Sequence, residues 1–298
     1  MRSSIILTTG LIITLFTSCK EQVEFQSNEC KKQPSFVRSI GFNPGRSAFS
    51  TSEKKTMGLV LVELQNQGEP RRYQHPSWRM GGWMGPIQLD QFGNCFVGPV
   101  PVVNVYNNPT AKQNTLYKVD ALSGIMNVFV ELPVTDSVHA VNPYGILGLA
   151  YLCETNTLYV SSVMSSDRTR EKGVVYALDA STGEILDKIP GIDILGMGIS
   201  YAPGTRTLYM GSARTSNIYA VTLTDKGKFS SKPQVVLSLA NLGPRGDDKV
   251  RRMRYNQYGA MLIYGVEFNF NLTAPTEKQE TVYEFSWDDT EGKWVFVK

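Results

Sequence analysis

The stretch LAYLCETNTLYV, residues 149–160, decides the fold, because similar stretches recur along the chain. Residues 199–210 read ISYAPGTRTLYM, and residues 253–264 read MRYNQYGAMLIY. Each copy has an apolar run ending in an aromatic residue, then a turn and a second apolar run, which predicts a β-hairpin. Weaker copies pair Ile40-Gly41-Phe42 with Ala48-Phe49-Ser50, and Ile87-Gln88-Leu89 with Cys95-Phe96-Val97. Such self-similarity is typical of repeat architectures.

A second hairpin follows each copy, and its turn ends in glycine. Residues 116–120 lead through a turn at Gly124 to residues 126–131, and residues 174–179 lead through Gly183 to residues 184–189. Glycine suits these turns because hairpin turns often need positive φ. The remaining turns are at Gly68, Gly227 and Gly292. Each unit therefore has four short strands in about 45–60 residues, which is typical of β-propeller blades.

The pattern predicts an all-β propeller of four-stranded antiparallel blades. We expect five blades, with six as the rival count, because every major segment is used and no sixth glycine turn remains. The expected blades are residues 36–76, 85–133, 145–190, 195–239 and 250–298. Residues 36–298 would then be one domain, preceded by a signal peptide at residues 1–18 and a polar tether at residues 19–35.

Composition limits the function classes. The chain has 298 residues, of which 42% are hydrophobic and 19% charged, so a large folded core is expected. A net charge of +3 is too mild to indicate nucleic-acid binding. Two histidines and four cysteines do not supply a zinc framework of conventional spacing. We therefore expect no metal, no cofactor and no nucleic-acid partner.

The first residues have the pattern of a secretory signal peptide. A single Arg2 precedes the apolar run Ile5–Phe16, which is too short to span a bilayer. The exit Phe16-Thr17-Ser18-Cys19 resembles a bacterial lipobox, although Phe16 stands where leucine is usual. The resemblance implies a lipid on Cys19, and Lys20 after it implies the outer membrane. The alternative is an ordinary signal peptide that contains a cysteine.

Three cysteines remain if Cys19 carries lipid. They are Cys30, Cys95 and Cys153, so at least one thiol is unpaired. Export permits a disulfide, but spacing alone selects no pair. Small buried filler is the alternative interpretation of Cys95 and Cys153.

The clearest candidate site is an arginine cluster on the first strand of the last unit. Arg251, Arg252 and Arg254 replace small or apolar residues of the other units, which are Leu147, Gly148 and Ala150 in the third unit and Met197, Gly198 and Ser200 in the fourth. Arginine forks suit carboxylate and phosphate, so the cluster predicts an anion site at the mouth of the propeller channel. The alternative is a structural ion-pair network with Asp247 and Asp248.

Long loops on the channel face supply candidate neighbours. Arg214, Trp83 and His139 lie on such loops. Trp83 would stack on a ligand, whereas the alternative has Trp78 and Trp83 filling the gap between the first two blades. A lone loop histidine such as His139 is more often a surface hydrogen-bonder than a catalyst. No catalytic residue is therefore predicted.

The units resemble two groups of propellers. The strand-Asp-Ala-x-x-Gly-strand pattern resembles quinoprotein-type and YncE-like repeats, and the aromatic-ended hairpin resembles the SMP-30/gluconolactonase and NHL group. The SMP-30 resemblance implies a metal-dependent hydrolase, but that family's Glu-Gly-Pro stands here as Met84-Gly85-Pro86. Its Asn-Gly pair would fall near Leu147-Gly148 or Met197-Gly198, without asparagine. We therefore expect a lipid-anchored, non-enzymatic binding or scaffold protein for an unidentified small molecule or protein, with the hydrolase as the alternative.

Overall fold

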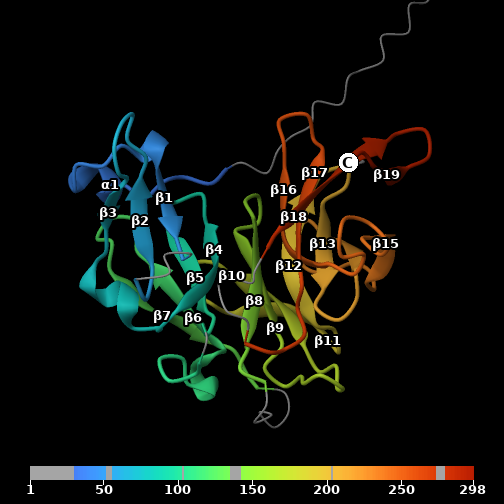
Figure 1. The fold of residues 1–298 in the computed structure, drawn as a ribbon, viewed down its shortest axis with the longest axis horizontal. Helices are drawn as coiled ribbons and strands as arrows, with labels where there is room; N and C mark the ends of the chain where they lie inside the picture. The colour runs from blue at the N-terminus through green and yellow to red at the C-terminus, as the bar shows by residue number, and fades with distance from the viewer. Residues whose placement is uncertain (1–29, 52–55, 103, 135–141, 203, 273–278) are drawn as a thin grey trace, which may run out of the picture.

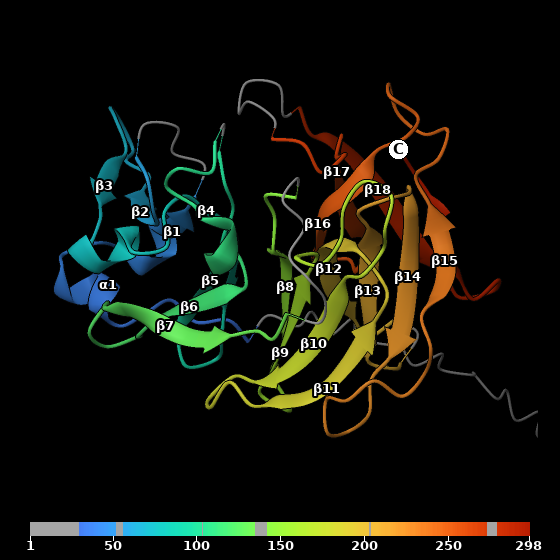
Figure 2. The ribbon, with the colours of Figure 1, turned by 90° about the horizontal axis from the view of Figure 1, so that it is seen from below.

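The computed structural model describes residues 30–298 except 52–55, 103, 135–141, 203 and 273–278. These residues form five separate antiparallel sheets, and each sheet is made of consecutive strands. Figure 1 shows the sheets side by side, and Figure 2 shows them from below, following one another from blade 1 to blade 5. The fold is an all-β five-bladed propeller, which confirms the predicted class and blade count.

Blade 1 follows a short helical segment, and blade 2 follows a second one. The segment before blade 1 contains α1 (Phe36–Ser39) and η1 (Pro44–Arg46). Blade 1 contains β1 (Ser47–Ser50), β2 (Val60–Glu63) and β3 (Arg71–Tyr73), followed by η2 (Pro76–Arg79). Blade 2 contains β4 (Met84–Leu89), β5 (Cys95–Pro99), η3 (Thr110–Lys112), β6 (Thr115–Val119) and β7 (Met126–Glu131).

Blades 3 to 5 have four strands each, and the first strand of each blade is the innermost. Blade 3 contains β8 (Ile146–Leu152), β9 (Thr157–Ser162), β10 (Val174–Asp179) and β11 (Ile185–Pro190). Blade 4 contains β12 (Ile194–Ser200), β13 (Thr207–Ser212), β14 (Asn217–Thr222) and β15 (Gln234–Ser238). Blade 5 contains β16 (Lys249–Tyr255), β17 (Met261–Val266), β18 (Thr281–Asp288) and β19 (Lys293–Phe296).

Blade 1 differs from the prediction. Its sheet has three strands among the described residues, whereas the other four sheets have four. The predicted strand at Ile40-Gly41-Phe42 is wrong, because Ile40 is the C-cap of α1 and Gly41 has φ of +76°. The amide of Gly41 donates to the carbonyl of Arg38, which closes the helical turn.

The repeated aspartate-to-glycine turns have one cause. Asp120 Oδ1 accepts hydrogen bonds from the amides of Leu122 and Ser123, and Gly124 then adopts φ of +70°. Asp179 and Gly183 repeat this arrangement in blade 3. The aspartate satisfies the turn amides and glycine supplies the left-handed residue, so the sequence pattern fixes the hairpin.

Four hydrophobic clusters join successive blades. The cluster between blades 1 and 2 contains the fully buried Trp78, whose indole donates to the carbonyl of Gly124 at 2.8 Å. Similar clusters join blades 2 and 3, 3 and 4, and 4 and 5. Among the described residues, no cluster contains residues of both blade 5 and blade 1. Blades 5 and 1 also share no sheet there, so no strand pairing joins them.

A disulfide fixes the segment that precedes α1. Cys30 is bonded to Cys153, which lies in the turn between β8 and β9. Cys95 is a free and fully buried thiol, and burial raises its pKa. The segment then runs beneath blade 2, where Lys32 N donates to Asp90 O and Phe36 N donates to Ala121 O.

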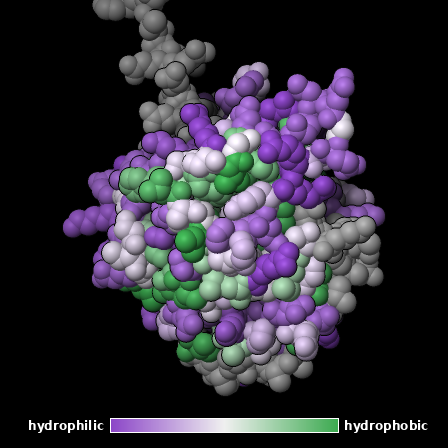
Figure 3. Space-filling view, turned by 90° about the vertical axis from the view of Figure 1, so that its left-hand side faces the viewer, coloured by the Kyte–Doolittle hydropathy of each residue, from purple (hydrophilic) through white to green (hydrophobic). Residues whose placement is uncertain are grey.

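No helix in the described ranges combines the length and apolarity needed to cross a bilayer. Figure 3 shows the side where blade 1 lies, with hydrophobic side chains in separate groups among hydrophilic ones. Scattered apolar groups of this kind are ordinary on protein surfaces.

Candidate functional site

The inner strands of blades 3, 4 and 5 share a β-bulge near the channel mouth. The strand register shifts at Leu147 in β8, at Leu195 in β12 and at Arg251 in β16. These three residues are therefore equivalent. The predicted equivalence of the blade 5 arginines with Met197 and Gly198 of blade 4 was wrong by two residues, whereas that with blade 3 is confirmed.

An apolar cluster fills the channel mouth around this level. It contains Leu147 and Leu195 from the bulges, and Val163, Ala213 and Val266 from the ends of the second strands. Arg251 is the charged counterpart of the two bulge leucines. Its guanidinium is half-exposed and lies 3.5 Å from Glu280 Oε1.

The connection between β17 and β18 crosses this mouth, and we call its residues 266–272 the strap. Phe270 is buried in the apolar cluster, with Phe268 and Leu272 packed against it. The hydroxyl of Tyr144 donates to the carbonyl of Asn271 at 2.7 Å, which ties the strap to blade 3. Burial raises the pKa of Tyr144 to about 12. The strap therefore links blade 5 to blades on the far side of the channel.

Arg252 and Arg254 lie on a different surface from Arg251. The first cross-strand pair after the bulge is Gly148–Ser161 in blade 3, Gly196–Gly211 in blade 4 and Arg252–Tyr264 in blade 5. A Cβ on Gly211 would lie 2.2 Å from Val250 Cβ of the next blade. This face of each sheet, which we call the forward face, looks toward the next blade.

At Arg252, Arg254 and Tyr264 the forward face of blade 5 therefore carries large side chains, where blades 3 and 4 carry glycine, alanine or serine. The same face also carries Leu262, Val282 and Glu284, and the Glu284 carboxylate pairs with Lys298 Nζ at 3.0 Å. Arg252 and Arg254 are exposed, and Val282 is 50% exposed. The opposite face, with Met253, Ile263 and Tyr283, packs against blade 4.

The charges on the forward face are unbalanced. Arg252 Nη2 donates to Glu280 Oε2 at 2.7 Å, so Glu280 bridges Arg251 and Arg252. The Arg252 guanidinium lies 4.1 Å from the centroid of the Tyr264 ring, and that of Arg254 lies 5.8 Å from it. Within the described part of the chain, Arg254 has no acidic partner.

Asp247 and Asp248 do not pair with the three arginines. Asp248 is fully buried, accepts a charge-assisted bond from Arg245 and accepts the Tyr283 hydroxyl at 2.7 Å. Burial alone would raise the pKa of Asp248, but the bonds from Arg245 and Tyr283 outweigh it and lower this pKa. Asp247 lies beside Lys249. The predicted alternative network thus exists around Arg245 rather than around the arginine cluster.

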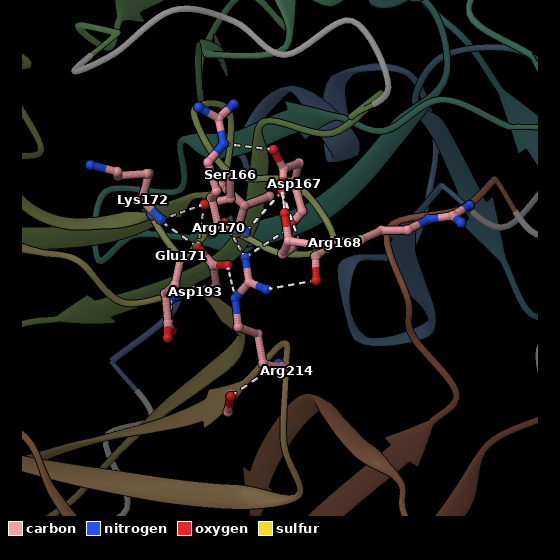
Figure 4. Close-up of polar contacts among 12 residues, drawn as sticks. Ser166, Asp167, Arg168, Arg170, Glu171, Lys172, Asp193 and Arg214 are labelled. Atoms are coloured by element: carbon pink, nitrogen blue, oxygen red, sulfur yellow. Dashed lines mark hydrogen bonds and ion pairs between the residues drawn. The ribbon is translucent and has the colours of Figure 1, made fainter.

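Arg214 belongs to a separate polar cluster on blades 3 and 4 (Figure 4). Its Nε donates to the fully buried carboxylate of Asp193. Its Nη2 donates to the carbonyl of Asp167 at 2.7 Å, and its guanidinium lies 5.0 Å from the Phe270 ring. The Ser166 hydroxyl and the Gly173 amide also donate to Asp193. Arg214 therefore clamps the β9–β10 loop and one end of the strap.

The Asp193 carboxylate is held in a low-dielectric place. Burial raises its pKa, and the Ser166 hydroxyl and Arg214 oppose that rise. Asp167 has the reverse balance, because amides of Thr169 and Arg170 hold its pKa well below the ordinary value. Both carboxylates accept hydrogen bonds from donors within the protein, so the cluster holds the β9–β10 loop in place.

Trp83 lies at the edge of this face, before β4. Its amide donates to Asn108 Oδ1 at 2.9 Å, and its carbonyl accepts from Asn108 Nδ2. Asn108 is buried and fixes the backbone, whereas the Trp83 side chain is half-buried. Trp78, the other predicted aromatic, fills the interface between blades 1 and 2. His139 and Cys19 lie outside the described residues.

The residues that sequence reasoning missed are Glu280 and the strap aromatics. Glu280 follows a polar run and has no local signal, because its partners are brought to it by sheet pairing. The strap carries a signal in its closely spaced aromatics, Phe268 and Phe270. No group of three or more metal-ligating side chains occurs in the part of the chain that the structure describes.

Comparison with known proteins shows the fold alone. No family model matches the sequence, and no curated protein matches it. The calcium-binding protein regucalcin from Agrobacterium tumefaciens aligns at 14% identity and TM-score 0.51, over 89% of this chain and 72% of its own. A Xanthomonas campestris gluconolactonase aligns at 14% identity and TM-score 0.42, over 70% and 65%. The chain is thus a β-propeller structurally similar to regucalcin at low identity.

Proposed function

We propose that this protein is a lipid-anchored, non-enzymatic binding protein of the bacterial cell envelope. Its ligand carries negative charge and binds at Arg251, Arg252 and Arg254 on the inner part of blade 5. Arg214 lies at the neighbouring loops, and Trp83 and His139 remain candidate contacts. The anchor would be a lipid on Cys19, most consistent with the outer membrane.

One observation carries the ligand proposal. Arg252 and Arg254 project side by side over Tyr264 on an exposed sheet face, with Glu280 as the acidic neighbour of Arg252. Guanidinium groups on an aromatic ring are preorganised, and their free edges suit carboxylate or phosphate. The blade packing does not require them, because the equivalent positions in blades 3 and 4 are glycine and alanine.

Export is supported independently by the cysteines. The Cys30–Cys153 bond is of a kind that persists in oxidising compartments and is rare in the cytosol. The short apolar run before Cys19 agrees with the same route.

The alternative, a metal-dependent hydrolase of the SMP-30 type, has less support. The inner-strand positions near the channel mouth hold Leu147, Leu195 and Arg251, and none of these is an oxygen ligand for a hard cation. The similarity to regucalcin concerns the fold, and a propeller fold assigns no activity.

Thermal denaturation of the full chain in mild detergent tests the proposal. Citrate or inorganic phosphate at constant ionic strength should raise the melting temperature by mass action, and calcium should not. Arg252→Ala/Arg254→Ala should abolish the shift, whereas Lys226→Ala/Lys228→Ala removes two charges from a distant turn and should retain it. The proposal is wrong if the arginine variant keeps the shift, or if calcium stabilises the protein and lactone hydrolysis appears.

A further inference from the structure

The forward face of blade 5 has a spacing that narrows the class of ligand. Arg252 and Arg254 are two residues apart on one strand, so their Cα atoms are about 6.6 Å apart. An extended peptide places its own residues i and i+2 on one side at the same separation, about 6.6 Å. Resting on the proposed function, we infer that the ligand is an extended acidic segment of a partner protein, with carboxylates at alternate positions.

Neighbouring side chains fit a peptide better than an isolated ion. Tyr264 and Val282 continue the row of Arg252 across the sheet, and Leu262 stands beside Arg254 and separates it from Glu284, which pairs with Lys298. Each arginine is therefore next to apolar surface that the residues flanking a carboxylate can cover. Arg252 and Arg254 supply the charge and Tyr264 supplies the platform, which together suit a chain of mixed acidic and apolar residues.

Glu280 shows how a carboxylate engages this face. Its Oε2 accepts from Arg252 Nη2 at 2.7 Å, while Arg254 two residues further lacks a comparable partner among the described residues. A ligand carboxylate would complete the second position and would compete with Glu280 for the first. Removing the Glu280 charge should therefore strengthen binding of the acidic segment. If Glu280 had only a structural role, its removal would not strengthen this binding.

Another blade is not the expected occupant. In blade 4, Gly196 and Gly211 let the backbone and Val250 of blade 5 approach closely. Arg252 and Tyr264 occupy that row in blade 5 and keep a neighbouring sheet from the same approach. A single extended segment does not need to approach the backbone of blade 5 as closely as a sheet does. It can lie across the side chains, with its carboxylates toward the guanidinium groups.

Fluorescence anisotropy with two labelled peptides of equal charge and composition tests the spacing. One is Glu-Thr-Glu-Thr-Glu-Thr-Thr-Thr, and the other is Glu-Thr-Thr-Glu-Thr-Thr-Glu-Thr, which has no glutamates two residues apart. The full chain in mild detergent should bind the first about tenfold more tightly, a difference of about 1.4 kcal/mol. The preference should disappear in Arg254→Ala, and Glu280→Gln should tighten binding of the first peptide several-fold.

Control variants separate this inference from the proposed function. Arg252→Gln/Arg254→Gln keeps side-chain length and should lose binding about as fully as the double alanine variant, while Lys226→Ala/Lys228→Ala should bind as the unaltered chain does. Equal affinity for both peptides, with loss in the arginine variants, overturns the alternate spacing and leaves an anion site. Arginine-dependent binding to phosphatidylglycerol vesicles or phosphate without peptide binding also overturns it. Arginine-independent results with every probe overturn both proposals.

Discussion

Two buried aspartates, each paired with an arginine, respond to their surroundings in opposite directions. Asp193 and Asp248 are both fully buried, yet burial raises the pKa of Asp193 while donors lower that of Asp248. Each carboxylate accepts three hydrogen bonds, but two of those to Asp248 come from Arg245, whereas Asp193 receives one from Arg214 and lies near Glu171, whose negative charge raises the Asp193 pKa further. Similar residue types thus make different contributions to the pH dependence of stability.

Asp248→Asn should flatten the acid dependence of folding stability. A pKa lowered in the folded state gives stability that is present above the unfolded pKa of 3.8 and is lost as the pH falls through the folded value. Breaking this pair should also cost about 3 kcal/mol at pH 7. Urea unfolding at pH 7 and pH 3 measures both effects.

Asp193→Asn is the matched comparison. Its raised pKa means that the folded state takes up the proton more readily, so this group opposes acid destabilisation as the pH falls toward 3.8. Its replacement should steepen the loss of stability between pH 7 and pH 3. Equal slopes for the two asparagine variants would contradict the assignment.

The blades illustrate how far element boundaries follow from sequence. The five predicted ranges coincide closely with the sheets, because each hairpin is local and its aspartate and glycine fix the turn. Blade 1 was harder, because Ile40-Gly41-Phe42 has the apolar spacing of a strand but closes a helical turn. The sequence also could not predict which faces of the sheet Arg251 and Arg252 occupy, because a β-bulge between them interrupts the alternation of side chains along the strand.

Gly211→Ala should destabilise the interface between blades 4 and 5. The added Cβ would meet the side chain of Val250, and overpacking in a core costs about 1–3 kcal/mol. Arg252→Ala, on the equivalent row of blade 5, should change the free energy of unfolding by less than about 1 kcal/mol. Chemical denaturation of the two variants gives the comparison, and equal losses would show that the forward face of blade 5 is packed like the others.

The whole molecule is a series of five blades, and no strand pairing joins blade 5 to blade 1 among the described residues. Four hydrophobic clusters connect neighbouring blades, and the strap crosses from blade 5 to blades 3 and 4 over the channel mouth. The disulfide adds a covalent link on the opposite side, between the segment before blade 1 and the first hairpin of blade 3. Stability at this scale therefore depends on a few long-range links.

Cys30→Ser/Cys153→Ser should lower the free energy of unfolding by about 4 kcal/mol. The bond joins residues separated by 123 positions, and a long closed loop restricts the unfolded chain strongly. Urea denaturation with and without dithiothreitol measures the loss. The reductant should weaken the unaltered protein to a similar degree and leave the double variant unchanged. A large effect of reductant on the double variant would point to another covalent link.

The position of Cys30 also sets the reach of the protein from a membrane. Cys153 lies in the turn between β8 and β9, at the end of blade 3 opposite the strap. The disulfide therefore attaches the tether on that side of the molecule. If Cys19 is acylated, residues 19 to 30 span at most about 40 Å. Such a short tether would keep the side that bears Cys153 facing the membrane, so that the strap and the arginines would face away from it. A partner would then have to approach the arginines from the aqueous side, and a partner lying along the bilayer surface would not reach them.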